Sequence, residues 1–143
     1  MVPADGGDAR QVTDDASADF LPVWSPDGND LIFSSNREDG IRRLWRVPAR
    51  GGEAVRLSAG PGLAAHWSAD GKTLYFIGWG ERADNIWALS TQDRKEYPVT
   101  DLSGRYGRLE NSSLDTDREY LYFIWAEDLG DIWVMDVVTD ESE

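Results

Sequence analysis

The sequence contains no cysteine and one histidine, and its acidic residues outnumber its basic ones. Without cysteine, the chain has neither a disulfide framework nor a thiolate metal site. The 27 acidic residues against 14 basic ones give a formal net charge of −13. This charge argues against non-specific nucleic-acid binding, which needs a basic face to displace counterions from phosphate. We expect a solvated, self-repelling surface. A saline habitat or a basic partner would also account for the charge.

Long apolar runs are absent as well. No stretch approaches the roughly 18 residues of a membrane helix, so we expect no membrane insertion. The N-terminus, MVPADGGDAR, lacks the basic start and apolar stretch of a secretory signal.

What the sequence does contain is an internal repeat. An aromatic-containing apolar strand recurs at Phe33, Phe76 and Phe123, with spacings of 43 and 47 residues. A second set, Trp45, Trp87 and Trp133, recurs with spacings of 42 and 46. A period of about 40–50 residues with four short strands per unit is typical of β-propeller blades.

Each unit is predicted to be a four-stranded antiparallel sheet. Asp-Gly between two apolar runs, at residues 27–28 and 70–71, is a strong hairpin signal because glycine takes positive φ without steric cost. The apolar runs are only four or five residues long and rich in β-branched and aromatic types, which disfavours helices. Both faces of such a sheet can be apolar, because neighbouring blades cover each of them.

The motif resembles a known family of repeats. WSPDG at residues 24–28, the strand around Phe33, LWRVP at residues 44–48 and Gly-Gly at residues 51–52 are similar to the WD40-like (PD40) repeat of TolB-like propellers. The resemblance covers nearly the whole chain and implies an all-β propeller of four-stranded blades. A TolB-like protein is expected in the periplasm if a leader has been removed; otherwise we expect the cytoplasm.

The strand count predicts how the domain is organised. We expect one half-propeller domain over residues 1–143, with repeats at about 2–13 (outer strand only), 20–58, 63–100 and 109–138 (lacking the outer strand). Three blades do not close a ring, since propellers have about four to eight. We therefore predict a homodimer that forms a six-bladed ring, each N-terminal strand completing the last blade of the other chain. The start at a repeat boundary would also fit a truncated or engineered fragment.

Catalytic signatures are scarce. His66 is the single histidine, and a hydrolase triad needs a nucleophile, a base and an acid. We therefore predict no enzymatic activity, no catalytic residue, no cofactor and no metal site. His66 is expected to pack near the central channel, and the turn aspartates Asp27, Asp70 and Asp117 to bond turn amides. A channel-lining ligand contact is the alternative for His66.

Function in propellers usually lies on loops. The loops expected on the top face carry the aromatic and arginine residues typical of binding hot spots. For Trp79 and Tyr106, the alternative to binding is that their rings pack under their own loops. The predicted binding residues, on top-face loops or in the channel, are Trp79, Arg82, Arg105, Tyr106, Arg108, Glu110 and His66.

The leading functional prediction is a non-catalytic, TolB-like module that binds a protein or peptide. One alternative is the propeller of a tricorn-like or prolyl-oligopeptidase-like protease, which gates substrate while another domain does the chemistry. Another is a truncated or designed half-propeller with a purely structural role.

Overall fold

The computed structural model describes residues 1–82, 84–117, 119–127 and 131–136, and it consists of three antiparallel β-sheets. Sheet A contains β1 (Asp19–Trp24), β2 (Asp30–Ser35), β3 (Arg43–Pro48) and β4 (Val55–Arg56). Sheet B contains β5 (Leu63–Trp67), β6 (Thr73–Gly78), β7 (Asn85–Ser90) and β8 (Glu96–Pro98). Sheet C contains β9 (Arg108–Thr116), β10 (Tyr120–Ala126) and β11 (Asp131–Asp136).

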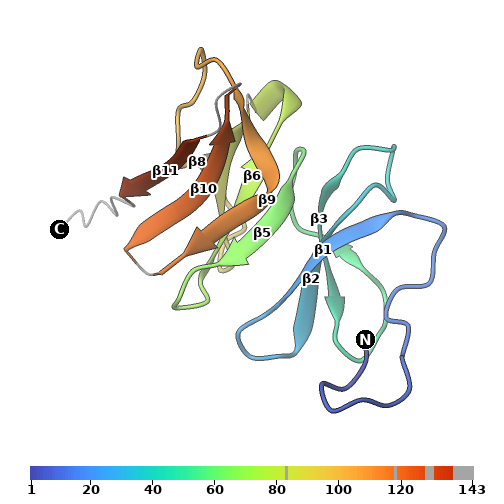
Figure 1. The fold of residues 1–143 in the computed structure, drawn as a ribbon. Helices are drawn as coiled ribbons and strands as arrows, with labels where there is room; N and C mark the ends of the chain where they lie inside the picture. Colours follow the sequence, from blue (N-terminus) through green and yellow to red (C-terminus); the bar gives the residue numbers. More distant parts are fainter. Residues whose placement is uncertain (83, 118, 128–130, 137–143) are drawn as a thin grey trace.

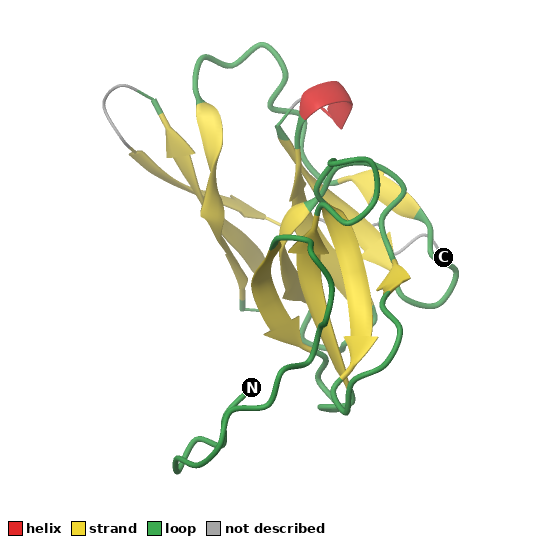
Figure 2. Cartoon of the chain, turned by 90° about the vertical axis from the view of Figure 1, so that its right-hand side faces the viewer, coloured by secondary structure: helices red, strands yellow, loops and turns green. Residues whose placement is uncertain are grey.

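The sheets follow one another as blades. In Figure 1 sheet A lies on the right, sheet B in the middle and sheet C on the left, and β5 contacts β1, β2 and β3 on one side and β9 on the other. The only helical element among the described residues is the short 3-10 turn η1 (Gly80–Arg82), drawn red in Figure 2. No helix of the described chain has the length and apolar character needed to cross a bilayer. The predicted all-β propeller architecture, with three blade equivalents, is confirmed.

Local turn chemistry sets the hairpins. Gly28 and Gly71 both have φ of 70°, the left-handed region that only glycine enters without strain. The carboxylate of Asp27 accepts the amide of Asn29 at 3.1 Å, and that of Asp70 accepts the amide of Lys72 at 3.0 Å. Asp117 accepts the amide of Glu119 at 3.1 Å in the third unit, although that unit lacks the turn glycine. The predicted role of the three aspartates is thus confirmed.

The core consists of side chains between the sheets. Alternation along each strand sends Ile32 toward sheet B and Phe33 to the opposite, open face of sheet A. Between sheets A and B the buried residues are Ile32, Leu44, Ala65, Leu74, Phe76 and Leu89. Between sheets B and C they are Leu63, Ile77, Ile86, Leu102, Leu109, Leu114, Leu121, Phe123 and Trp125. Each blade is therefore held by apolar burial on the faces that its neighbours cover.

The N-terminal segment differs from the expected strand. Residues 1–18 contain no strand, whereas the repeat predicts an outer strand at residues 10–13. The segment lies beside sheet A, where Val12 packs against Phe33, Trp45 and Val47. A strand needs an edge to pair with, and the edge predicted for this one belongs to a second chain. The homodimeric ring stays a prediction.

Candidate functional site

A cavity of about 490 Å³ lies where loops and strand ends of the three blades meet. Its lining comes from the β2–β3 loop, the β6–β7 loop and the first residues of β5 and β9. The lining residues are Gly40, Ile41, Arg42, Leu63, Trp79, Asp84, Arg108 and Leu109. All three blades therefore contribute to one hollow, and it lies on the face where the sequence predicted the binding loops.

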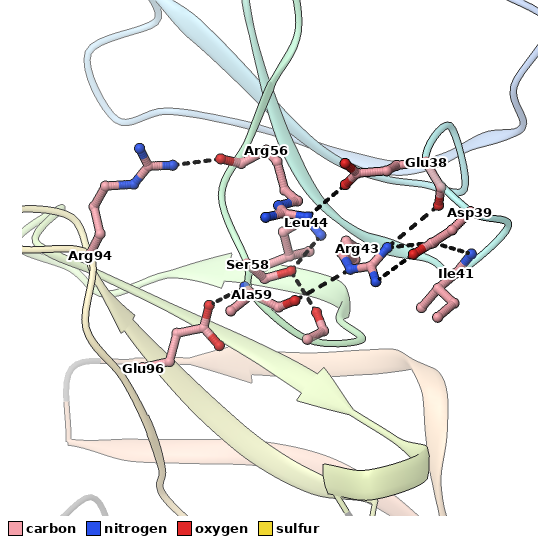
Figure 3. Close-up of polar contacts among 11 residues, drawn as sticks. Glu38, Asp39, Ile41, Arg43, Leu44, Arg56, Ser58, Ala59, Arg94 and Glu96 are labelled. Atoms are coloured by element: carbon pink, nitrogen blue, oxygen red, sulfur yellow. Dashed lines mark hydrogen bonds and ion pairs between the residues drawn. The ribbon is translucent and has the colours of Figure 1, made fainter.

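The β2–β3 loop is held by two ion pairs, in which the Arg43 side chain is nearly buried and its partner Asp39 is exposed (Figure 3). Arg43 donates to Asp39 Oδ1 at 2.6 Å and to Asp39 Oδ2 at 3.0 Å, and this hydrogen bonding lowers the pKa of Asp39 and raises the pKa of Arg43. Asp39 Oδ1 also accepts the amide of Ile41 at 3.2 Å. Glu38 pairs with Arg56 of β4 at 2.6 Å. These contacts hold the loop so that Ile41 and Arg42 face the cavity.

The β6–β7 loop is held by the buried Asn85. Its Oδ1 accepts the hydroxyl of Thr100 at 3.0 Å and the amide of Leu102 at 2.7 Å, while its Nδ2 donates to the carbonyl of Arg82 at 3.3 Å. One amide side chain thus links the β6–β7 loop to the β8–β9 loop. The link places Asp84 beside the start of sheet C.

The start of β9 is positioned by a close backbone contact. Trp125 Nε1 donates to the carbonyl of Tyr106 at 3.0 Å. Gly107, with φ of 124°, lies against the Trp125 ring and the Ala126 carbonyl, where a Cβ would come within 2.7 Å of that oxygen. Only glycine fits here, and the turn directs Arg108 to the cavity.

Two of the predicted binding residues meet in this cavity. Trp79 and Arg108 both line it, from different blades. Trp79 is also half-buried against the core between sheets B and C, so it packs and lines the cavity at once. The Arg108 side chain is 71% exposed, and its guanidinium lies 3.1 Å from Glu110, which brings a third predicted residue to the edge of the site.

Arg82 lies elsewhere, in the interior. Its guanidinium is 4.3 Å from the Trp87 ring centroid and 5.5 Å from that of Phe76, and it forms an ion pair with the buried Glu96. Sequence reasoning placed Arg82 at a binding surface because it lies in a loop. The structure shows it as a packed, inter-element residue.

His66 lies on β5, apart from the cavity lining. Its Nε2 is 3.0 Å from Asp115 Oδ1 of β9, and its Nδ1 is 3.2 Å from the Trp67 carbonyl. Both neighbours are hydrogen-bond acceptors. The contact with Asp115 links sheet B to sheet C. A neutral imidazole carries one N–H, so the ring can donate to one of these two acceptors at a time.

The β8–β9 loop carries the remaining predicted residues, Arg105 and Tyr106. Tyr106 is 75% exposed, so its ring does not pack under the loop. Neither residue lines the cavity. Their role in binding stays a prediction.

Sequence reasoning missed six of the eight lining residues, among them Ile41, Arg42 and Asp84. A hint for Arg42 lies in the adjacent Arg43. Two consecutive arginines at residues 42–43 cannot both be buried against one aspartate, so one of them is expected at the surface. Arg43 takes the buried position, and the Arg42 guanidinium lies 4.5 Å from the centroid of the exposed Phe20 ring. No sequence signal indicated Asp84, because its place depends on how sheet B meets sheet C.

The lining chemistry suits binding. Leu63, Leu109 and Trp79 supply apolar surface, Arg42 and Arg108 supply positive charge, and Asp84 supplies one negative charge. The lining contains no serine, threonine, cysteine or histidine that could act as a nucleophile or base. Among the described residues, no three histidine, aspartate or glutamate side chains gather closely enough to hold a metal ion.

The chain is similar over part of its length to proteins named as peptidases and in fold to TolB structures, although no protein-family model matches it. It is 39% identical over 69 residues to the uncharacterized peptidase YuxL of Bacillus subtilis, which covers 45% of this chain and 10% of that protein. It is 35% identical over 88 residues to tricorn protease homolog 1 of Streptomyces coelicolor, covering 57% of this chain and 8% of that one. The crystal structure of TolB from Acinetobacter baumannii superimposes with a TM-score of 0.75 and 19% identity, covering 94% of this chain and 34% of TolB.

These relatives correct one prediction. The absence of a catalytic set in the sequence predicted a protein that is not an enzyme, and the relatives named as peptidases contradict this. The inference failed because a propeller blade without catalytic residues can still be part of an enzyme. The chain spans a tenth or less of the length of those two peptidases. Its fold is that of a TolB-like β-propeller.

Proposed function

We propose that this chain is the propeller segment of a peptidase and that its inter-blade cavity holds part of a peptide substrate. The carrying observation is the identity of 39% and 35% to two proteins named as peptidases, in a chain whose described residues form three antiparallel sheets. The cavity lining offers contacts for a peptide but contains no serine, threonine, cysteine or histidine. Peptide-bond cleavage would therefore use residues outside that lining.

The charges of the lining suggest the kind of peptide. The lining carries Arg42 and Arg108 against Asp84, and Glu110 pairs with Arg108 at its edge, so the cavity is less acidic than the rest of a chain with a net charge of −13. Leu63, Leu109 and Trp79 offer apolar and aromatic contacts. The cavity therefore favours a peptide in which an apolar side chain lies next to a carboxylate.

The test is fluorescence anisotropy with a fluorescein-labelled peptide that alternates leucine and aspartate, compared with one that alternates leucine and lysine. We expect the acidic peptide to bind more tightly. The double variant Arg42→Ala with Arg108→Ala should weaken its binding tenfold or more, which corresponds to about 1.4 kcal/mol.

The matched control is Arg50→Ala together with Arg46→Ala. These two arginines are exposed, lie outside the cavity and carry the same charge as the pair in the test. Equal weakening by the control would show non-specific attraction. No binding of either peptide to the unaltered chain would refute the proposal.

A further inference from the structure

A second cavity lies between sheets A and B, at the opposite end of the strands from the peptide cavity. Its volume is about 320 Å³, at the lower end of the range of sites that take small molecules. Its lining includes the β7–β8 turn, which follows Ser90 at the end of β7, whereas Asp84 of the peptide cavity precedes β7. The two linings share no described residue.

Two rows of opposing side chains form the walls of this cavity. Directly opposite residues of an antiparallel pair share one face of the sheet. The row of sheet A consists of Ile32, Arg46 and Val55. The row of sheet B consists of Trp67, Leu74 and Leu89. Ile32, Leu74 and Leu89 are each 1% exposed, so the inner part of the cavity is apolar.

Arg46 keeps one side of this junction polar. Its side chain is 50% exposed, and its Nη1 lies 3.8 Å from Oδ2 of Asp30, which also lines the cavity. One repeat later the equivalent residue is Ala88, which is 0% exposed. A guanidinium that stays in contact with water prevents the two sheets from closing over it. Because Arg46 and Asp30 carry opposite charges, the pair adds no net charge to the lining.

Arg94 supplies the remaining charge of the lining. It lies on the β7–β8 turn and donates a hydrogen bond to the Arg56 carbonyl of β4, across the junction between the two sheets (Figure 3). Within the described part of the chain, its guanidinium makes no other hydrogen bond or ion pair. The acid beside it, Asp93, is paired with Lys95 at 3.1 Å. Arg94 therefore gives the cavity a net positive charge on a chain whose formal net charge is −13.

Trp67 adds a hydrogen-bond donor that has no acceptor. Its Nε1 is buried and has no hydrogen-bond partner among the described residues. Trp45 and Trp87 share this feature, but neither of them lines the cavity. A buried indole N–H normally has a partner. An acceptor on a ligand in this cavity would supply one to Trp67.

We propose that this cavity binds a medium-chain carboxylate, an unbranched alkyl chain that ends in one carboxylate group. The carboxylate lies at the exposed Arg94, and the alkyl chain extends inward against Ile32, Leu74 and Leu89. Its charge complements the net positive lining, and its oxygens accept the hydrogen bonds that Arg94 and Trp67 have left to donate. The alkyl chain replaces water on an apolar wall. This inference is independent of the peptide site, because the two cavities share no described residue.

The first test compares ligands on the unaltered chain by isothermal titration calorimetry. Hexanoate, octanoate and decanoate differ only in chain length. Affinity should rise about fourfold for each added CH₂ group, which corresponds to about 0.8 kcal/mol per buried group. Octan-1-ol, which has the chain length of octanoate without the charge, should bind at least tenfold more weakly than octanoate. No binding of decanoate, or equal affinity for octanol and octanoate, overturns the proposal.

The second test locates the carboxylate. Arg94→Gln removes the charge but keeps a donor for the Arg56 carbonyl, and it should weaken octanoate binding about tenfold or more. Arg94→Lys keeps the charge and should stay within about threefold of the unaltered chain. Lys95→Gln is the matched control and should leave the affinity unchanged, because the Lys95 side chain lies on the same turn, is 80% exposed and is outside the lining. Equal weakening by Arg94→Gln and Lys95→Gln overturns the proposal.

Discussion

Arg82 offers the sharpest test of packing against binding, because the sequence predicted a surface role and the structure shows a buried one. The side chains of Arg82 and Glu96 are 11% and 10% exposed and form an ion pair. Glu96 also accepts the amide of Ala59 at 2.6 Å, which ties β8 to the loop between sheets A and B. We therefore expect Arg82→Met to act on stability.

The magnitude follows from what the substitution leaves behind. Removing one partner of a buried ion pair typically costs about 3–5 kcal/mol, because the other charge stays buried. The guanidinium also lies over the rings of Phe76 and Trp87, worth about 0.5–2 kcal/mol together. However, Arg82 Nη1 is buried without a hydrogen-bond partner among the described atoms. The variant no longer buries this unpaired donor, so the cost of burying it is absent. The expected loss in the free energy of unfolding is therefore near the lower end of that range, about 3 kcal/mol.

The assay is urea unfolding followed by tryptophan fluorescence, with a double-mutant cycle. Glu96→Gln keeps an oxygen for the Ala59 amide but removes the charge. The pair Arg82→Met with Glu96→Gln should therefore lose about 1–2 kcal/mol less than Arg82→Met alone. A loss below about 1 kcal/mol for Arg82→Met, combined with weaker peptide binding, would refute the packing role and restore the surface prediction.

Three further predictions follow from single contacts. The Ser25 hydroxyl and Asn29 lower the pKa of Asp27 to about 2. The contribution of Asp27 to stability is therefore present above the unfolded pKa of about 3.9 and is lost as pH falls toward 2. Asp27→Asn should flatten that part of the stability profile measured by urea unfolding. The Asp117 carboxylate raises the pKa of Tyr122 to about 12. The contribution of this contact to stability is present below about pH 10 and lost as pH rises toward 12, and Tyr122→Phe should remove a phenol that titrates near pH 12 from an ultraviolet titration. Gly107→Ala should lower the melting temperature by several degrees, whereas Gly104→Ala, where an added Cβ has no neighbour within 4 Å, should cost only the strain of its φ of 79°; equal losses would contradict the close-contact argument.

The structure of a single blade can be predicted from local sequence. Asp-Gly turns and the two-residue alternation of Leu31, Ile32 and Phe33 act within one hairpin, so their consequences can be worked out from neighbouring residues. The same local chemistry fixed the contacts of the turn aspartates.

How the blades meet cannot be predicted from local sequence. Whether Arg82 is buried, whether His66 reaches Asp115, and whether Ile41 and Arg42 join Trp79 and Arg108 in one cavity depend on the stacking of whole sheets. Stacking is set by side-chain volumes summed over two faces, and residues distant in sequence contribute to it together. The relation to peptidases could not be predicted for a related reason, because the residues that pack a blade do not include those that cleave a peptide.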